Sequence, residues 1–127
     1  MKDMRTPLGK VRGLGSAKEG TGHFWAQRMS AVALVPLVLF FVGLVASLHG
    51  ADYETVKAAL GHPVIAIVMA LFIVTGAYHM RLGMQVVVED YIHSEGLKIL
   101  LVMLNTFFSF VIGFAGIFAI LKLSFGG

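Results

Sequence analysis

The stretch that decides the fold is residues 63–91, which read PVIAIVMALFIVTGAYHMRLGMQVVVEDY. Its apolar run, from 63 to about 88, can cross a bilayer as one helix, because about 20 residues span the roughly 30 Å of hydrocarbon. His79 and Arg81 interrupt the run, and Asp90 and Tyr91 follow it. We therefore predict a membrane-spanning helix with two ionisable groups inside it and a polar pair at its end.

Two further uncharged runs, 29–48 and 99–121, are also long enough to cross a membrane. Hydrophobic residues make up 57% of the 127-residue chain and charged residues only 13%, which departs from soluble proteins in both respects. We predict an all-α integral membrane protein with three transmembrane helices at about 29–48, 63–88 and 99–121. Residues 23–127 form this three-helix anchor, and residues 1–22 form a basic N-terminal tail that is extended or disordered until a partner covers it.

Charge is distributed unevenly along the chain. Residues 1–28 carry six basic and two acidic side chains, whereas the rest carries four basic and five acidic ones. Basic residues flanking a span favour the cytoplasmic side, so we expect a cytoplasmic N-terminus and a return of the chain to that side around Asp90. The basic segment is too sparse to indicate nucleic-acid binding. Cysteine is absent, which excludes a disulfide or a thiolate metal site.

The segments beside the spans carry their own signals. Residues 51–60 read as a short amphipathic surface helix, with Asp52 or a neighbour as its N-cap. Pro63 follows a break and is placed near a helix start. Asn105, Thr106 and Ser109 are polar positions in the third span, and Asn105 and Ser109 share one face. We expect them to turn inward and to form hydrogen bonds with a neighbouring helix.

His79 and Asp90 lie on nearly the same face of the second span, because eleven helical steps amount to three turns plus about 20°. Gly76 and Gly83 fall in the same sector, one turn to either side of His79. Two interpretations remain open. The glycines leave room for a flat macrocycle whose iron takes the imidazole as an axial ligand, or they allow close helix packing.

If His79 binds a haem, the second axial ligand must come from another chain. The other four histidines all fall near membrane edges, away from the depth of His79: His23, His49, His62 and His93. The haem interpretation therefore requires a partner subunit.

The charged and phenolic side chains near the cytoplasmic edge also allow two interpretations. Arg28 could neutralise a haem propionate or bind a ligand oxygen, or it could simply be a positive-inside anchor. Tyr91 could donate to a quinone carbonyl while Asp90 relays protons, or the two could be an aromatic-belt tyrosine and a helix-ending acid. Arg81 lies away from the His79 face, and we favour a structural role for it.

The sequence from His79 to Met84 (HMRLGM), together with that from Glu89 to His93 (EDYIH), resembles the small hydrophobic membrane anchor of succinate dehydrogenase, respiratory complex II. The resemblance covers nearly the whole chain. It implies that His79 is an axial ligand of haem b, that Tyr91 hydrogen-bonds the ubiquinone carbonyl, and that Asp90 is its acidic neighbour. It also implies that Arg28 lies near the haem propionates and the quinone pocket. The run at residues 15–22, GSAKEGTG, looks like bacterial forms, which implies a bacterial inner membrane.

The resemblance further implies partners and an activity. A second membrane anchor supplies the other haem histidine, and a flavoprotein and an iron–sulfur subunit carry the FAD and the clusters. This chain would tether those subunits and would catalyse nothing alone. Two alternatives stay open: a fumarate reductase anchor working in the opposite direction, and a cofactor-free assembly or accessory subunit.

Overall fold

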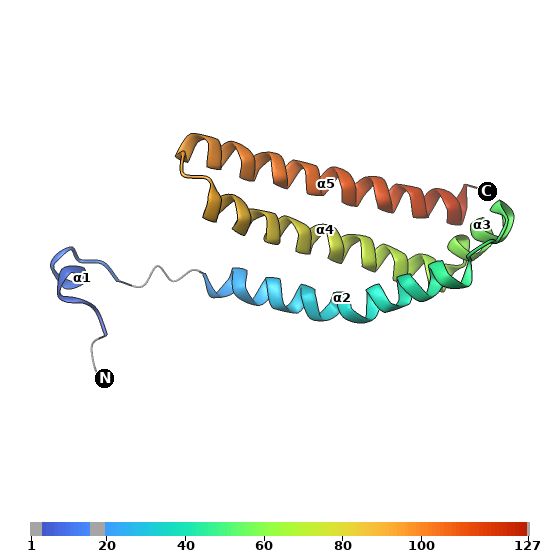
Figure 1. Cartoon of the computed structure of the whole chain (residues 1–127), viewed down its shortest axis with the longest axis horizontal. Helices are drawn as coiled ribbons and strands as arrows, with labels where there is room; N and C mark the ends of the chain where they lie inside the picture. Colours follow the sequence, from blue (N-terminus) through green and yellow to red (C-terminus); the bar gives the residue numbers. More distant parts are fainter. Residues whose placement is uncertain (1–3, 16–19, 127) are drawn as a thin grey trace.

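The computed structural model describes residues 4–15 and 20–126, and all regular structure in these ranges is helical (Figure 1). Three helices in the described ranges are long and apolar enough to cross a membrane, which confirms the predicted all-α, three-helix membrane architecture. The elements, in chain order, are α1 (Pro7–Val11), α2 (Thr21–Ser47), α3 (Tyr53–Gly61), α4 (Pro63–Tyr91) and α5 (Glu95–Phe125).

The long helices extend beyond the apolar runs that predict them. α2 starts before residue 29 and continues through Pro36 as one helix. α4 begins with Pro63 in its first turn, where the missing N–H would have no helical partner in any case. α5 begins before residue 99 and runs past residue 121. Which part of each helix lies within the hydrocarbon stays a prediction.

The short helix α3 begins where the sequence indicates. Asp52 is its N-cap, and the Asp52 carboxylate accepts a hydrogen bond from the Thr55 N–H at 3.0 Å. The hydrogen bonds to Thr55 hold the pKa of Asp52 below its usual value, because they favour the ionised carboxylate. Before α3, Gly50 takes a φ of +77°, a left-handed conformation that glycine adopts without strain. This turn lets the chain leave α2 and start α3.

α4 is the central helix of the layer. It packs against α2 on one side and α5 on the other, whereas no Cα atoms of α2 and α5 come within 8 Å of each other in the described ranges (Figure 1). The phenyl rings of Phe41 on α2 and Phe72 on α4 stack with their centroids 4.9 Å apart. Beside them, Ala66 and Met69 of α4 and Ile120 of α5 form a small buried cluster. Most other apolar side chains face outward, as expected for helices surrounded by lipid or by partner helices.

The N-terminal tail departs from its prediction. The expectation of an extended or disordered chain is wrong for Pro7–Val11, which forms the short helix α1. The Thr6 hydroxyl caps it by accepting from the Gly9 N–H at 3.1 Å, and Pro7 occupies the first turn. A side-chain cap and a proline at the start are the local signals that favour this turn. The run at 15–22 that looks bacterial lies partly outside the described residues, which omit 16–19.

Candidate functional site

His79 on α4 is held against α2 by a hydrogen bond. Its Nδ1 lies 2.9 Å from the hydroxyl oxygen of Ser30, and Ser30 is buried with 6% of its surface exposed. The same hydroxyl oxygen is 2.7 Å from the Ala26 carbonyl oxygen and 3.1 Å from that of Gln27. The imidazole is half-buried. The Ser30 hydroxyl therefore orients the His79 side chain against α2.

Ser30 belongs to a polar stripe on α2 that sequence reasoning missed. His23, Gln27 and Ser30 recur at helical spacing on one face of a mostly apolar helix, and this spacing is the signal that could have found them. Two buried atoms of the stripe, His23 Nε2 and Gln27 Oε1, have no hydrogen-bond partner in the described part of the chain. Buried polar atoms are normally paired. The stripe thus has hydrogen-bonding capacity that the chain does not satisfy itself.

The two glycines beside His79 have different surroundings. A Cβ atom built at Gly83 would lie 3.6 Å from Gln27 Nε2, an ordinary contact, so α2 covers this glycine. A Cβ atom at Gly76 would meet nothing within 4 Å. Gly83 therefore lies where two helices approach, whereas Gly76 borders open space beside His79.

The residues predicted for the membrane edge lie on two different helices. Asp90 and Tyr91 occupy the C-terminal end of α4, and Tyr91 is 75% exposed. Arg28 is exposed on α2, with its guanidinium 4.6 Å from the centroid of the Phe24 ring. Within the described ranges, no hydrogen bond or ion pair joins Arg28 to Asp90 or Tyr91.

Arg81 connects α4 to α5. Its Nε donates to the Thr106 hydroxyl at 3.4 Å, and its backbone carbonyl accepts from the Asn105 side-chain amide at 2.9 Å. The prediction that Asn105 bonds a neighbouring helix is confirmed. Ser109 is buried as expected, but its hydroxyl donates to the Asn105 carbonyl within α5, so the interhelical bond expected for it is wrong. The contacts of Arg81 agree with the structural role favoured for it.

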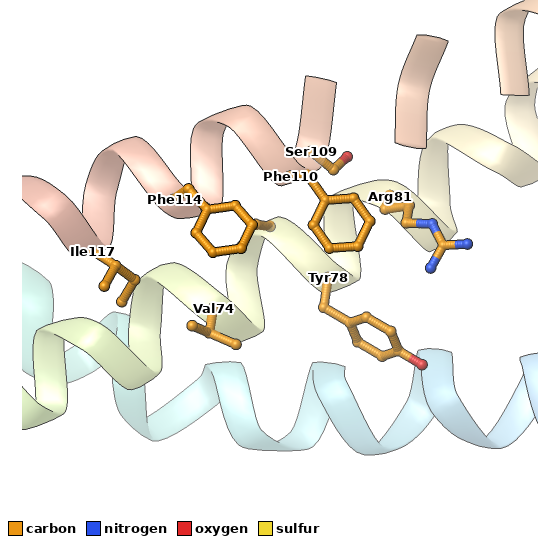
Figure 2. Close-up of a pocket in the computed structure, with 9 residues that line it drawn as sticks. Val74, Tyr78, Arg81, Ser109, Phe110, Phe114 and Ile117 are labelled. Atoms are coloured by element: carbon orange, nitrogen blue, oxygen red, sulfur yellow. The ribbon is translucent and has the colours of Figure 1, made fainter. Parts of the chain in front are cut away.

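A mostly apolar pocket with a volume of about 240 Å³ lies next to Arg81, between α4 and α5 (Figure 2). In this view the Arg81 guanidinium extends away from the rings of Phe110 and Phe114 and from Val74. The pocket lining includes neither His79 nor Tyr91. This pocket is therefore distinct from the predicted functional face.

The described residues contain no group of three or more His, Cys, Asp or Glu side chains that could hold a metal ion. A haem makes a smaller demand, because the porphyrin supplies four ligands and the protein supplies only axial ones. The observation on the described residues therefore concerns metal ions held by side chains alone.

The three long apolar helices of the described residues define a small, multi-pass membrane protein. The chain belongs to the succinate dehydrogenase/fumarate reductase transmembrane subunit family, whose model matches residues 2–113. It is 34% identical over 121 residues to the succinate dehydrogenase hydrophobic membrane anchor subunit of Paracoccus denitrificans, covering 95% of this chain and 93% of that protein. It is also 34% identical over 107 residues to the corresponding subunit of Rickettsia bellii, covering 84% and 86%.

A third relative, the succinate dehydrogenase membrane anchor subunit of Reclinomonas americana, is 35% identical over 92 residues, covering 68% of this chain and 75% of that protein. No solved structure matches the chain significantly. The relatives confirm the resemblance found in the sequence: the chain is of the succinate dehydrogenase membrane anchor type, a subunit that works in association with the other subunits of that enzyme complex.

Proposed function

We propose that this chain is the membrane anchor of a succinate:ubiquinone oxidoreductase and that His79 is one axial ligand of a haem b shared with a second anchor subunit. The observation that carries the proposal is the placement of His79. Its Nδ1 is engaged by Ser30, which leaves Nε2 as the nitrogen that can bind iron. The open space at Gly76 allows a flat group to approach the same helix face. When bound, the haem supplies a one-electron redox centre within the membrane.

The quinone part of the proposal depends on Tyr91, Asp90 and Arg28. The Tyr91 phenol is exposed and can donate a hydrogen bond to a quinone carbonyl oxygen. Asp90, also exposed, can pass a proton to the reduced quinone. The Arg28 guanidinium can neutralise a propionate or bind a ligand oxygen. All three side chains are exposed in this chain, so groups from the partner subunits can contact them when the complex assembles.

The proposal includes an orientation and a set of partners. The basic N-terminus lies in the cytoplasm, and Tyr91 lies on the same side, where a flavoprotein and an iron–sulfur subunit would be tethered. FAD and the iron–sulfur clusters stay in those subunits, and this chain catalyses no reaction alone. The membrane is the bacterial inner membrane, in keeping with the Paracoccus and Rickettsia relatives.

The decisive experiment is the reduced-minus-oxidised spectrum of the purified complex carrying His79→Ala. We expect the b-type bands to be lost or altered, because iron would lose an axial ligand. His62→Ala is the matched control: His62 precedes α4, and its side chain makes no capping hydrogen bond. An unchanged spectrum in the His79→Ala complex would reject the ligand assignment. Absence of any b-type spectrum in the wild-type complex would favour a cofactor-free anchor.

The family description also names fumarate reductase, so an anchor working in the opposite net direction is the second candidate. The two differ in the quinone they use. Preference of the purified complex for a high-potential quinone as electron acceptor supports succinate oxidation. Faster turnover with a low-potential quinol as electron donor supports fumarate reduction.

A further inference from the structure

The Ser30 hydroxyl makes more contacts than it has hydrogens. Its oxygen lies 2.9 Å from His79 Nδ1, 2.7 Å from the Ala26 carbonyl oxygen and 3.1 Å from the Gln27 carbonyl oxygen. A serine hydroxyl has one hydrogen to donate and two lone pairs that accept. The two carbonyl oxygens can only accept. The shortest contact, to Ala26, therefore takes the hydroxyl hydrogen.

This assignment fixes the role of the imidazole. With its hydrogen directed to Ala26, the Ser30 oxygen must accept from His79, so the proton sits on Nδ1. The reverse arrangement would give the hydroxyl hydrogen to Nδ1. Two carbonyl oxygens would then face the hydroxyl oxygen at 2.7 and 3.1 Å without a hydrogen between them. Two oxygens that both present lone pairs repel each other at such distances, which disfavours this tautomer.

We infer that Ser30 is the positioning residue for His79: it holds the Nδ1–H tautomer and the ring orientation, so that the Nε2 lone pair is presented to the iron. This inference rests on the proposed haem ligation. Metal-binding histidines usually donate their second ring N–H to an acceptor, which fixes the tautomer and raises the basicity of the ligating nitrogen. Here a hydroxyl on the adjacent helix is the acceptor, and its own bond to Ala26 strengthens it as an acceptor.

The hydrogen bond from His79 to Ser30 should also affect the midpoint potential of the haem. A more basic axial imidazole stabilises the ferric state more than the ferrous state, and this lowers the midpoint potential. Removing the Ser30 acceptor therefore shifts the potential to more positive values. It also weakens haem retention, since loss of such a partner typically costs about 10- to 100-fold in metal affinity or activity.

The test compares Ser30→Thr with Ser30→Val in the assembled complex. The two side chains have nearly the same shape, so any packing defect is shared and only the hydroxyl differs. Threonine in a helix can also donate to the carbonyl four residues back. We expect the Thr variant to keep the wild-type midpoint potential and low-temperature haem spectrum. We expect the Val variant, and Ser30→Ala with it, to show a more positive potential and lower haem occupancy.

Ser109→Ala is the matched control. Ser109 is buried, with 5% exposed, and its hydroxyl donates to the Asn105 carbonyl four residues back, yet it has no histidine partner. Its removal should leave the potential unchanged. Equal potentials in the Thr and Val variants, with haem present in both, would overturn the role of Ser30 and leave His79 as the ligand. Failure of the haem-ligand proposal is distinguished by an unchanged spectrum in His79→Ala.

Discussion

Gly116 on α5 lies directly against Ile73 on α4, so that a Cβ atom built at Gly116 would approach Ile73 Cγ2 to 2.7 Å. Real Cβ atoms essentially never come this close to a neighbour. Ile73 is β-branched and stiff at χ1, so it cannot easily turn away. This pair sets how closely the two helices approach.

Gly116→Ala should therefore destabilise the complex by about 1–3 kcal/mol, the usual cost of overpacking. Gly113→Ala is the control on the same helix, because its Cβ would lie 3.6 Å from Ala77 Cβ, an ordinary contact. That variant should be neutral or slightly stabilising, since alanine favours helix by about 1 kcal/mol over glycine. Thermal denaturation of the purified complex measures both. Combining Ile73→Ala with Gly116→Ala should cost less than the sum of the single changes, and strict additivity would argue against the contact.

Asn105→Leu should weaken the joint between α4 and α5. The Asn105 amide is buried, with 9% of the residue exposed, and donates to the Arg81 carbonyl at 2.9 Å. Interhelical hydrogen bonds of this kind in membranes contribute about 0.6 kcal/mol on average. We expect a small fall in the denaturation midpoint and no change in the haem spectrum. Ser47→Ala removes a hydroxyl bonded only within α2 and should have no effect. An equal fall of the denaturation midpoint in both variants would argue against a stabilising role for the hydrogen bond between Asn105 and Arg81.

Tyr91→Phe should impair quinone reduction while leaving succinate oxidation by an artificial acceptor intact. The change removes only a phenolic hydroxyl from an exposed ring, so folding should be unaffected. Tyr53→Phe is the matched control, because Tyr53 is a similarly exposed tyrosine at the start of α3. Steady-state rates with quinone and with the artificial acceptor give the comparison. Loss of both activities would point to a defect in assembly and not to a quinone contact.

The start of α3 should loosen in acid. The pKa of Asp52 is lowered by its bonds to Thr55, so this stabilisation is complete above the unfolded-state pKa and is lost as pH falls through the folded-state pKa. Hydrogen–deuterium exchange of the first-turn amides, corrected for intrinsic rates at each pH, should rise at low pH. Asp52→Asn keeps a capping oxygen and should remove this pH dependence. A persistent dependence would exclude the Asp52 carboxylate as its cause.

Much of the fold could be predicted from local patterns. The three apolar runs predict the three long helices. Asp52 predicts the N-cap of α3. The spacing of polar residues in the third span predicts the inward position of Asn105. Each of these signals depends on residues close together in the sequence. The short helix α1 was missed because its hydroxyl cap and proline were outweighed by the polar composition around them.

The site could be predicted only in part. His79 stands out as an ionisable residue in an apolar helix, but its partner Ser30 lies 49 residues away, and the hydropathy of a helix does not reveal its register against a neighbour. The same limit explains why Gly76 and Gly83 looked equivalent on the helical wheel but have different neighbours. For Tyr91, Asp90 and Arg28 we propose that the complementary groups belong to other chains, and a pattern within this sequence cannot position groups of that kind.

α4 packs against both α2 and α5 in the described ranges, and many apolar side chains on all three helices remain exposed. A copy without its partner subunits would leave the exposed apolar surfaces of α2, α4 and α5 uncovered. Under the haem proposal, Nε2 of His79 would also lack its iron. We expect such orphan copies to be cleared by membrane proteases. The cellular level of this chain should then follow the supply of its partners more closely than its own rate of synthesis.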